Sequence, residues 1–256
     1  PELLQNYQKQ HGDDWWSAYQ KDFRRAIQNY ETLRRKLDKR LDQERSQRGY
    51  GLNQALSPEE MQELLSTIPD YLQQEEAKLR LAAEAYVGSC PVRVGDIVSF
   101  PTWQMHSLQH GVRVIEFQTP HYERMIVMFA QKVLTQGHWN TEEALARMKP
   151  EIYQPPQPEL IWQQDGVRCE RVVNFPDFDA FRLHVPTGKR IHLEGKGNYQ
   201  LLMGVEGYGQ LFVGGESCGT VRHEEGWMVP AVTDDCWLES RGTEDLLCLQ
   251  AIPKSN

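Results

Sequence analysis

Two side chains near the middle of the sequence could do chemistry, His106 and Arg124. His106 follows an apolar run at 97–100 and a turn that begins at Pro101, and a second apolar run begins at Val112. A turn at a strand end holds its side chains rigidly, and a neutral imidazole in that place is a good metal ligand. The guanidinium of Arg124 could bind a phosphate in a bidentate manner or stabilise an enediolate oxyanion. Together they predict a metal site that takes an anionic substrate.

Both residues also have a purely structural interpretation. A lone histidine in a turn is by default a hydrogen-bonded loop residue, and Arg124 could form an ion pair with Glu123 or Glu116. Glu116 could instead orient the imidazole of His106, as the outer partners of metal ligands do. We keep both interpretations of Arg124. For His106 we favour the ligand interpretation, because of its spacing from Pro101 and because the surrounding pattern is repeated.

The N-terminal region is expected to form a helical hairpin. From Asp14 to Arg45, apolar side chains recur every three or four residues, which gives a long helix one apolar stripe. Ser57-Pro58-Glu59-Glu60 is a capping box that begins a second helix. This helix is expected to reach Tyr86, with a break before Pro69 because proline disfavours helix at the preceding residue. The members of the stripe are Trp15, Tyr19, Phe23, Ile27, Tyr30, Leu33, Leu37 and Leu41.

The rest of the chain is expected to be rich in β structure. Residues 91–136 alternate apolar runs and turns, and Thr141 begins a short helix. After a proline-rich stretch, short strands punctuated by glycine suit a small antiparallel barrel or jelly roll. The clearest of these strands are 168–173, 199–206, 209–213 and 246–252. The predicted organisation is a helical region (1–90), a β region with a short helix (91–153), a linker (154–159) and a second β-barrel (160–256).

The two β regions share an internal repeat. The segment from Pro101 to His106 aligns with the segment from Pro230 to Asp235, and the strands that follow align after a short gap. His106 therefore corresponds to Asp235. A repeated β segment predicts two barrels of the same kind.

Residues 95–106 and 111–119 resemble a segment of type I phosphomannose isomerases that reads roughly G-D-x-x-x-x-P-A-G-x-x-H-x-L…G…E-I-Q. The resemblance covers residues 92–150 well. It implies a mainly β fold with helices, namely two cupin (double-stranded β-helix or jelly-roll) barrels and an N-terminal helical hairpin. It also implies that His106 is a zinc ligand. Arg124 matches a catalytic arginine of a T-Y-R sequence, although here Glu123 is inserted before it.

The second barrel is expected to bind no metal. The cupin motif of a histidine pair followed by E-x6-G has its nearest match from Gln200 to Gly207, where glutamine replaces glutamate. Leu193 and Gly195 stand where the two histidines are expected. His192 and Glu194 are one residue off, so strand alternation points them to the opposite face. A metal-free C-terminal cupin is also a property of the family that the chain resembles.

The resemblance implies three further zinc ligands, from Q-x-H and K-P-E motifs that precede the helical region. In this sequence only Pro1-Glu2-Leu3-Leu4 precedes the helices, and we attribute the likeness of Glu2 to the end of K-P-E to chance. A catalytic zinc takes three protein ligands and an open position, which His106 alone cannot supply. We therefore expect either that an N-terminal part of the natural protein precedes Pro1 or that the metal has been lost.

Composition narrows the function classes. A net charge of -8 argues against nucleic-acid binding, which needs a basic surface. No apolar run approaches the roughly 20 residues of a membrane span. Five scattered cysteines without a C-x-x-C pair predict reduced thiols, as in cytoplasmic proteins, and no zinc finger.

The sequence therefore favours a mannose-6-phosphate isomerase-like cupin that uses a metal, with zinc as cofactor and a phosphosugar as substrate. The second hypothesis is a non-catalytic cupin that binds a sugar or a protein partner, the latter through the helical region. A third is a different cupin chemistry, such as that of a lyase or dioxygenase, for which a facial set of histidines would bind iron. The fold alone does not choose among them.

Overall fold

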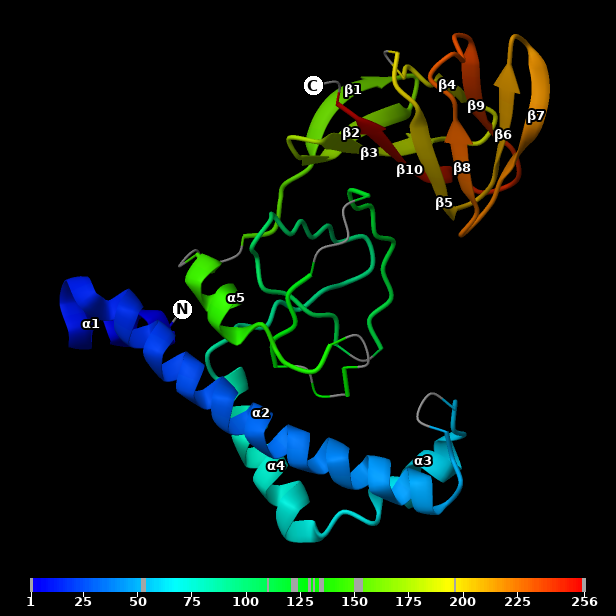
Figure 1. Ribbon diagram of the computed structural model, residues 1–256. Coiled ribbons are helices and arrows are strands. Elements are labelled where there is room, and N and C mark those ends of the chain that lie inside the picture. The colour runs from blue at the N-terminus through cyan, green and yellow to red at the C-terminus, as the bar shows by residue number, and fades with distance from the viewer. Residues whose placement is uncertain are drawn as a thin grey trace. The chain divides into compact units, whose positions relative to one another are not determined.

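A computed structural model describes residues 2–51, 54–109, 111–120, 124–128, 130, 132–133, 136–149, 154–195 and 197–254 (Figure 1). The chain forms two compact units. The first, here the helical unit, comprises Pro1–Val92, Trp103–Met105 and Tyr122–Ile152. The second, here the β unit, comprises Arg93–Thr102, His106–His121 and Tyr153–Asn256.

The predicted helices are confirmed. The apolar stripe forms α2, and Ser57 begins α3 with both bonds of a capping box: its side chain accepts from the Glu60 N–H, and its own N–H donates to the Glu60 carboxylate. The break expected before Pro69 separates α3 from α4. The helices are α1 (Glu2–His11), α2 (Trp15–Gln47), α3 (Pro58–Leu65), α4 (Asp70–Glu84) and α5 (Thr141–Arg147), with a 3₁₀ turn at Gly12–Asp14.

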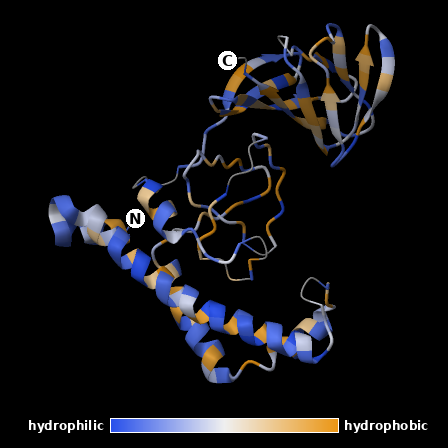
Figure 2. Ribbon diagram, in the orientation of Figure 1, coloured by the Kyte–Doolittle hydropathy of each residue, from blue (hydrophilic) through white to orange (hydrophobic). Residues whose placement is uncertain are grey.

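The stripe of α2 forms the core of the helical unit. Phe23, Ile27 and Tyr30 are fully buried, and their cluster includes Trp139, which precedes α5, and Leu145 of α5 itself. Further along α2, apolar residues of the stripe pack against α4. Figure 2 shows these apolar residues at regular intervals along a helix that is otherwise hydrophilic. Burial of one face therefore holds this long, polar helix in place.

The strands predicted within 91–136 are not found. No strand is assigned in the described parts of this segment, where backbone hydrogen bonds close turns, such as Asp96 N–H to Arg93 O and Val112 N–H to Gln109 O. An apolar run becomes a strand only when a neighbouring strand completes its backbone hydrogen bonds. Val94 is 99% exposed. The prediction of two barrels is therefore wrong for the described residues, whose strands all lie between Glu159 and Pro253.

In the β unit, the described strands form two antiparallel sheets, with orders β1-β2-β3-β10-β5-β8 and β4-β9-β6-β7. The four clearest strand predictions are confirmed by β2, β5, β6 and β10. Since the chain also carries long helices, its fold is mixed α and β rather than mainly β. The strands are β1 (Glu159–Gln164), β2 (Val167–Asn174), β3 (Phe178–Val185), β4 (Arg190–His192), β5 (Gln200–Glu206), β6 (Gly209–Val213), β7 (Glu216–Val221), β8 (Gly226–Val229), β9 (Cys236–Ser240) and β10 (Leu246–Pro253).

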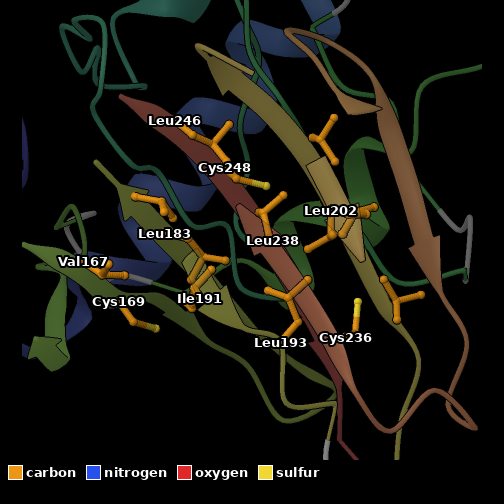
Figure 3. Packing of buried hydrophobic residues seen from close by; sticks show 14 residues of the cluster. Val167, Cys169, Leu183, Ile191, Leu193, Leu202, Cys236, Leu238, Leu246 and Cys248 are labelled. Atoms are coloured by element: carbon orange, nitrogen blue, oxygen red, sulfur yellow. The ribbon is translucent and has the colours of Figure 1, made fainter. Parts of the chain in front are cut away.

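The two sheets share one apolar core (Figure 3). Leu183 and Leu202 enter it from the larger sheet, and Leu211 and Leu238 enter it from the smaller one. Buried residues alternate along β9 and over most of β10, as the strand periodicity requires. The interior of this β unit is therefore filled by side chains.

All five cysteines are free thiols, as predicted. Cys169, Cys236 and Cys248 are buried in strands, whereas Cys90 and Cys218 are exposed. Burial raises the pKa of the Cys169 thiol to about 11, with a smaller contribution from Glu170. Among the helices of the described chain, none is both long enough and apolar enough to cross a membrane.

Candidate functional site

His106 lies in the β unit, after a turn in which Trp103 has φ of 72°. Its imidazole is exposed and stacks on the Phe100 ring, with ring centroids 4.1 Å apart and planes inclined by 7°. The predicted turn before His106 is thus confirmed. The imidazole therefore has an aromatic ring on one of its faces.

The described residues do not complete a metal site. Among them, no three His, Cys, Asp or Glu side chains are grouped closely enough to hold an ion. The neighbouring His110 and His121 lie outside the described residues. A catalytic zinc needs three protein ligands. The role of His106 as one of them therefore stays a prediction.

Arg124 lies in the helical unit, whereas His106 lies in the β unit. The structure therefore defines no distance between the two residues, and a shared site remains a prediction. Tyr122 and Glu123, which carry the T-Y-R resemblance, lie outside the described residues. Glu116 is exposed in the β unit.

In the β unit, Leu193 and Gly195 occupy the positions where the sequence comparison expects two histidines. Leu193 is 1% exposed and belongs to the core, while His192 and Glu194 point outward. This is the arrangement that strand alternation predicts. At Gly195, an added Cβ would lie 2.5 Å from the Asn198 backbone oxygen and 2.7 Å from Gln200 Nε2. A histidine does not fit at Gly195 unless the Gln200 amide and the Asn198 backbone move.

A buried amide pair lies next to this position. Gln200 is 1% exposed, and its Nε2 donates to the Leu193 carbonyl over 3.1 Å. Its Oε1 accepts a hydrogen bond from Nε2 of Gln250, which is also buried. These bonds satisfy buried polar groups that water does not reach. Gln200 and Gln250 therefore have a structural role in the core. Sequence reasoning missed Gln250, although the repeat had aligned its strand with the one after His106.

A second group of polar side chains lies on the outer face of the smaller sheet. His192 Nδ1 is 3.9 Å from Glu194 Oε1, and His192 Nε2 is 3.9 Å from Asp235 Oδ1. Asp235, the counterpart of His106, also accepts a hydrogen bond of 2.7 Å from the Trp237 indole. The Arg190 guanidinium lies 4.4 Å from the centroid of the Trp237 ring. Chemically, this face offers aromatic surface flanked by charges of both signs.

The comparisons with known proteins are distant. No family model and no curated protein matches the sequence. Among solved structures, mannose 6-phosphate isomerase from Bacillus subtilis is 11% identical with a TM-score of 0.38, over 45% of this chain and 34% of that chain. A cupin-family protein with a double-stranded β-helix fold from Methanocaldococcus jannaschii is 13% identical with a TM-score of 0.32, over 38% of this chain and 88% of that chain.

A cupin 2 conserved barrel domain protein from Salinispora arenicola is 14% identical with a TM-score of 0.33, over 40% of this chain and 88% of that chain. The matched part spans about a third of the length of the Bacillus subtilis isomerase. The chain thus has a distant structural similarity to cupin-fold proteins, a mannose 6-phosphate isomerase among them. At these scores the similarity assigns neither a family nor an activity.

Proposed function

We propose that this chain belongs to a phosphosugar isomerase of the mannose-6-phosphate type, which interconverts an aldose phosphate and a ketose phosphate. The proposal is carried by His106 after its proline turn, in the segment from Gly95 to Thr119 that resembles the family. The amide pair of Gln200 and Gln250 supports it, because the resemblance implies a C-terminal barrel without metal.

In this proposal, His106 is one metal ligand and Arg124 binds the substrate phosphate or an enediolate oxygen. Zinc would polarise the substrate oxygens when bound. Because the described residues do not complete a zinc site, we assign no reaction step to the metal. The chain itself supplies the imidazole of His106, which stacks on Phe100, and the positive charge of the Arg124 guanidinium.

A non-catalytic cupin is the second candidate, and one observation favours it. The interior of the β unit is filled by apolar side chains and by the Gln200 amide, so a ligand of this unit would have to bind on an outer face. The face that carries Trp237 and Arg190 has the aromatic surface and hydrogen-bonding groups that a sugar could use. A protein partner could instead bind the helical unit.

A coupled isomerase assay separates the two candidates. The chain is supplied with zinc and mannose 6-phosphate, and formation of fructose 6-phosphate is followed. We expect turnover that His106→Ala abolishes and that His138→Ala leaves unchanged, since His138 is an exposed histidine for which no site role is proposed. Sugar binding without turnover would favour the non-catalytic cupin, and equal activity in both variants would reject the role of His106.

A further inference from the structure

An open hollow in the helical unit lies between α2 and a segment of which residues 132–133 and 136–139 are described. Its volume is about 240 Å³. Two adjacent rows of residues along α2 supply most of its charged lining, and Lys132 supplies the rest. The charged residues that line it are Arg34, Arg35, Asp38, Lys39, Asp42 and Lys132.

Two interactions hold the segment against α2. Lys132 Nζ is 2.8 Å and 2.6 Å from the two carboxylate oxygens of Asp42, and the backbone N–H of Trp139 donates to Glu31 Oε1 over 2.9 Å. Since Glu31 and Asp42 are eleven residues apart, these anchors span about 16 Å of helix. Trp139 is buried, and its ring packs 5.5 Å from that of Tyr30. The walls of the hollow are therefore fixed at both ends.

The charges around the hollow do not cancel. Lys39 forms no ion pair with any described residue, so it is the surplus cation of the group. The other three cations are paired, Arg34 with Asp38, Arg35 with Glu31, and Lys132 with Asp42.

The paired arginines keep donors available for a ligand. The ion pairs of Arg34 and Arg35 use Nε and Nη2 of each guanidinium. A guanidinium carries five N–H donors, so each arginine retains donors beyond those two groups. The Arg34 and Asp38 side chains are only 14% and 19% exposed, which limits the screening of their charges by solvent. Forked donors beside an unpaired ammonium are the chemistry that recognises phosphate.

We propose that this hollow binds a small oxyanion of the phosphate class, either free phosphate or a phosphate monoester. Lys39 supplies the unbalanced charge, and Arg34 and Arg35 supply oriented donors. The volume lies below the roughly 300 to 1,000 Å³ of pockets for drug-sized ligands, which favours a small anion. This proposal concerns only the helical unit and does not depend on the isomerase activity.

Calorimetric titration of the full chain tests the proposal, with inorganic phosphate in one arm and a hexose 6-phosphate in the other. We expect Lys39→Gln to weaken binding about tenfold, the loss typical of one charge-assisted contact. Lys36→Gln is the matched control: Lys36 is an exposed lysine of the same helix that does not line the hollow, so binding should be unchanged. Tighter binding of one probe shows whether the site takes the free ion or the ester.

Two results would overturn the proposal. One is the absence of binding by either probe at millimolar concentration. The other is an equal loss of affinity in Lys36→Gln and Lys39→Gln, which would indicate attraction by general charge. Neither result bears on His106, and loss of isomerase activity in His106→Ala would leave binding at Lys39 intact. The two proposals can therefore fail separately.

Discussion

The side-chain amides of Gln200 and Gln250 are hydrogen-bonded to each other inside the β unit, and Gln200 also donates to the Leu193 carbonyl. Both side chains are buried, Gln200 at 1% and Gln250 at 5% exposure, so neither amide is satisfied by water. Their contribution to the protein is stability, and it can be measured.

Gln250→Ala should destabilise the protein by about 1 to 3 kcal/mol, because it leaves the buried Gln200 Oε1 without its donor. Urea unfolding measures the change. Gln163→Ala is the control, since Gln163 is exposed on β1 and its loss should cost less than about 0.5 kcal/mol. Replacing both Gln200 and Gln250 by leucine should recover part of the loss. Equal effects of Gln250→Ala and Gln163→Ala would contradict this account.

The apolar stripe of α2 predicts that Leu37→Ala lowers the free energy of unfolding much more than Leu81→Ala does. Leu37 is 2% exposed and Leu81 is 61% exposed. Leu37→Ala should cost about 2 to 5 kcal/mol through lost burial and the cavity left behind, whereas Leu81→Ala should cost below about 0.5 kcal/mol. Thermal or urea unfolding followed by circular dichroism gives both values. Similar losses would mean that the stripe does not form the core.

The capping box at Ser57 should stabilise the start of α3 by about 1 kcal/mol. In Ser57→Ala, amide hydrogens of α3 should therefore exchange about fivefold faster. Glu59→Gln is the control because Glu59 takes part in neither cap bond. Unchanged exchange in Ser57→Ala would show that the cap contributes nothing to the helix.

The buried thiol of Cys169 predicts a loss of stability at alkaline pH. Its pKa is raised by burial to about 11, above the ordinary value of 9.0, so folding favours the neutral thiol. The stabilisation is complete below pH 9.0 and is lost as pH rises through about 11. The urea midpoint should fall over this range, and less steeply in Cys169→Val. Identical pH dependence in both proteins would exclude this thiol as a cause.

Local signals predicted the helices and the strands of the β unit. The stripe of α2 and the cap at Ser57 depend on neighbours in sequence, and the outward direction of His192 follows from strand alternation alone. The strands expected at 91–136 failed because pairing is non-local. An apolar run such as 97–100 carries no information on whether a partner strand lies beside it.

Sequence reasoning predicts a feature of a candidate site only where neighbouring residues of one segment form it. The turn before His106 was read from local spacing. The partner of Gln200 was missed because Gln250 is fifty residues away in sequence. The sequence analysis did not single out Lys39, because the hollow beside it is formed only where Lys132 returns to α2.

The most direct test of the isomerase proposal is the metal content of the purified chain, measured by elemental analysis in wild type and in His106→Ala. The proposal predicts about one zinc per chain in the wild type, the stoichiometry of a single catalytic site, and a loss of most of that zinc in His106→Ala. Zinc content that is the same in both proteins would contradict the role of His106. Failure of the wild type to take up zinc would contradict metal-dependent catalysis by this chain.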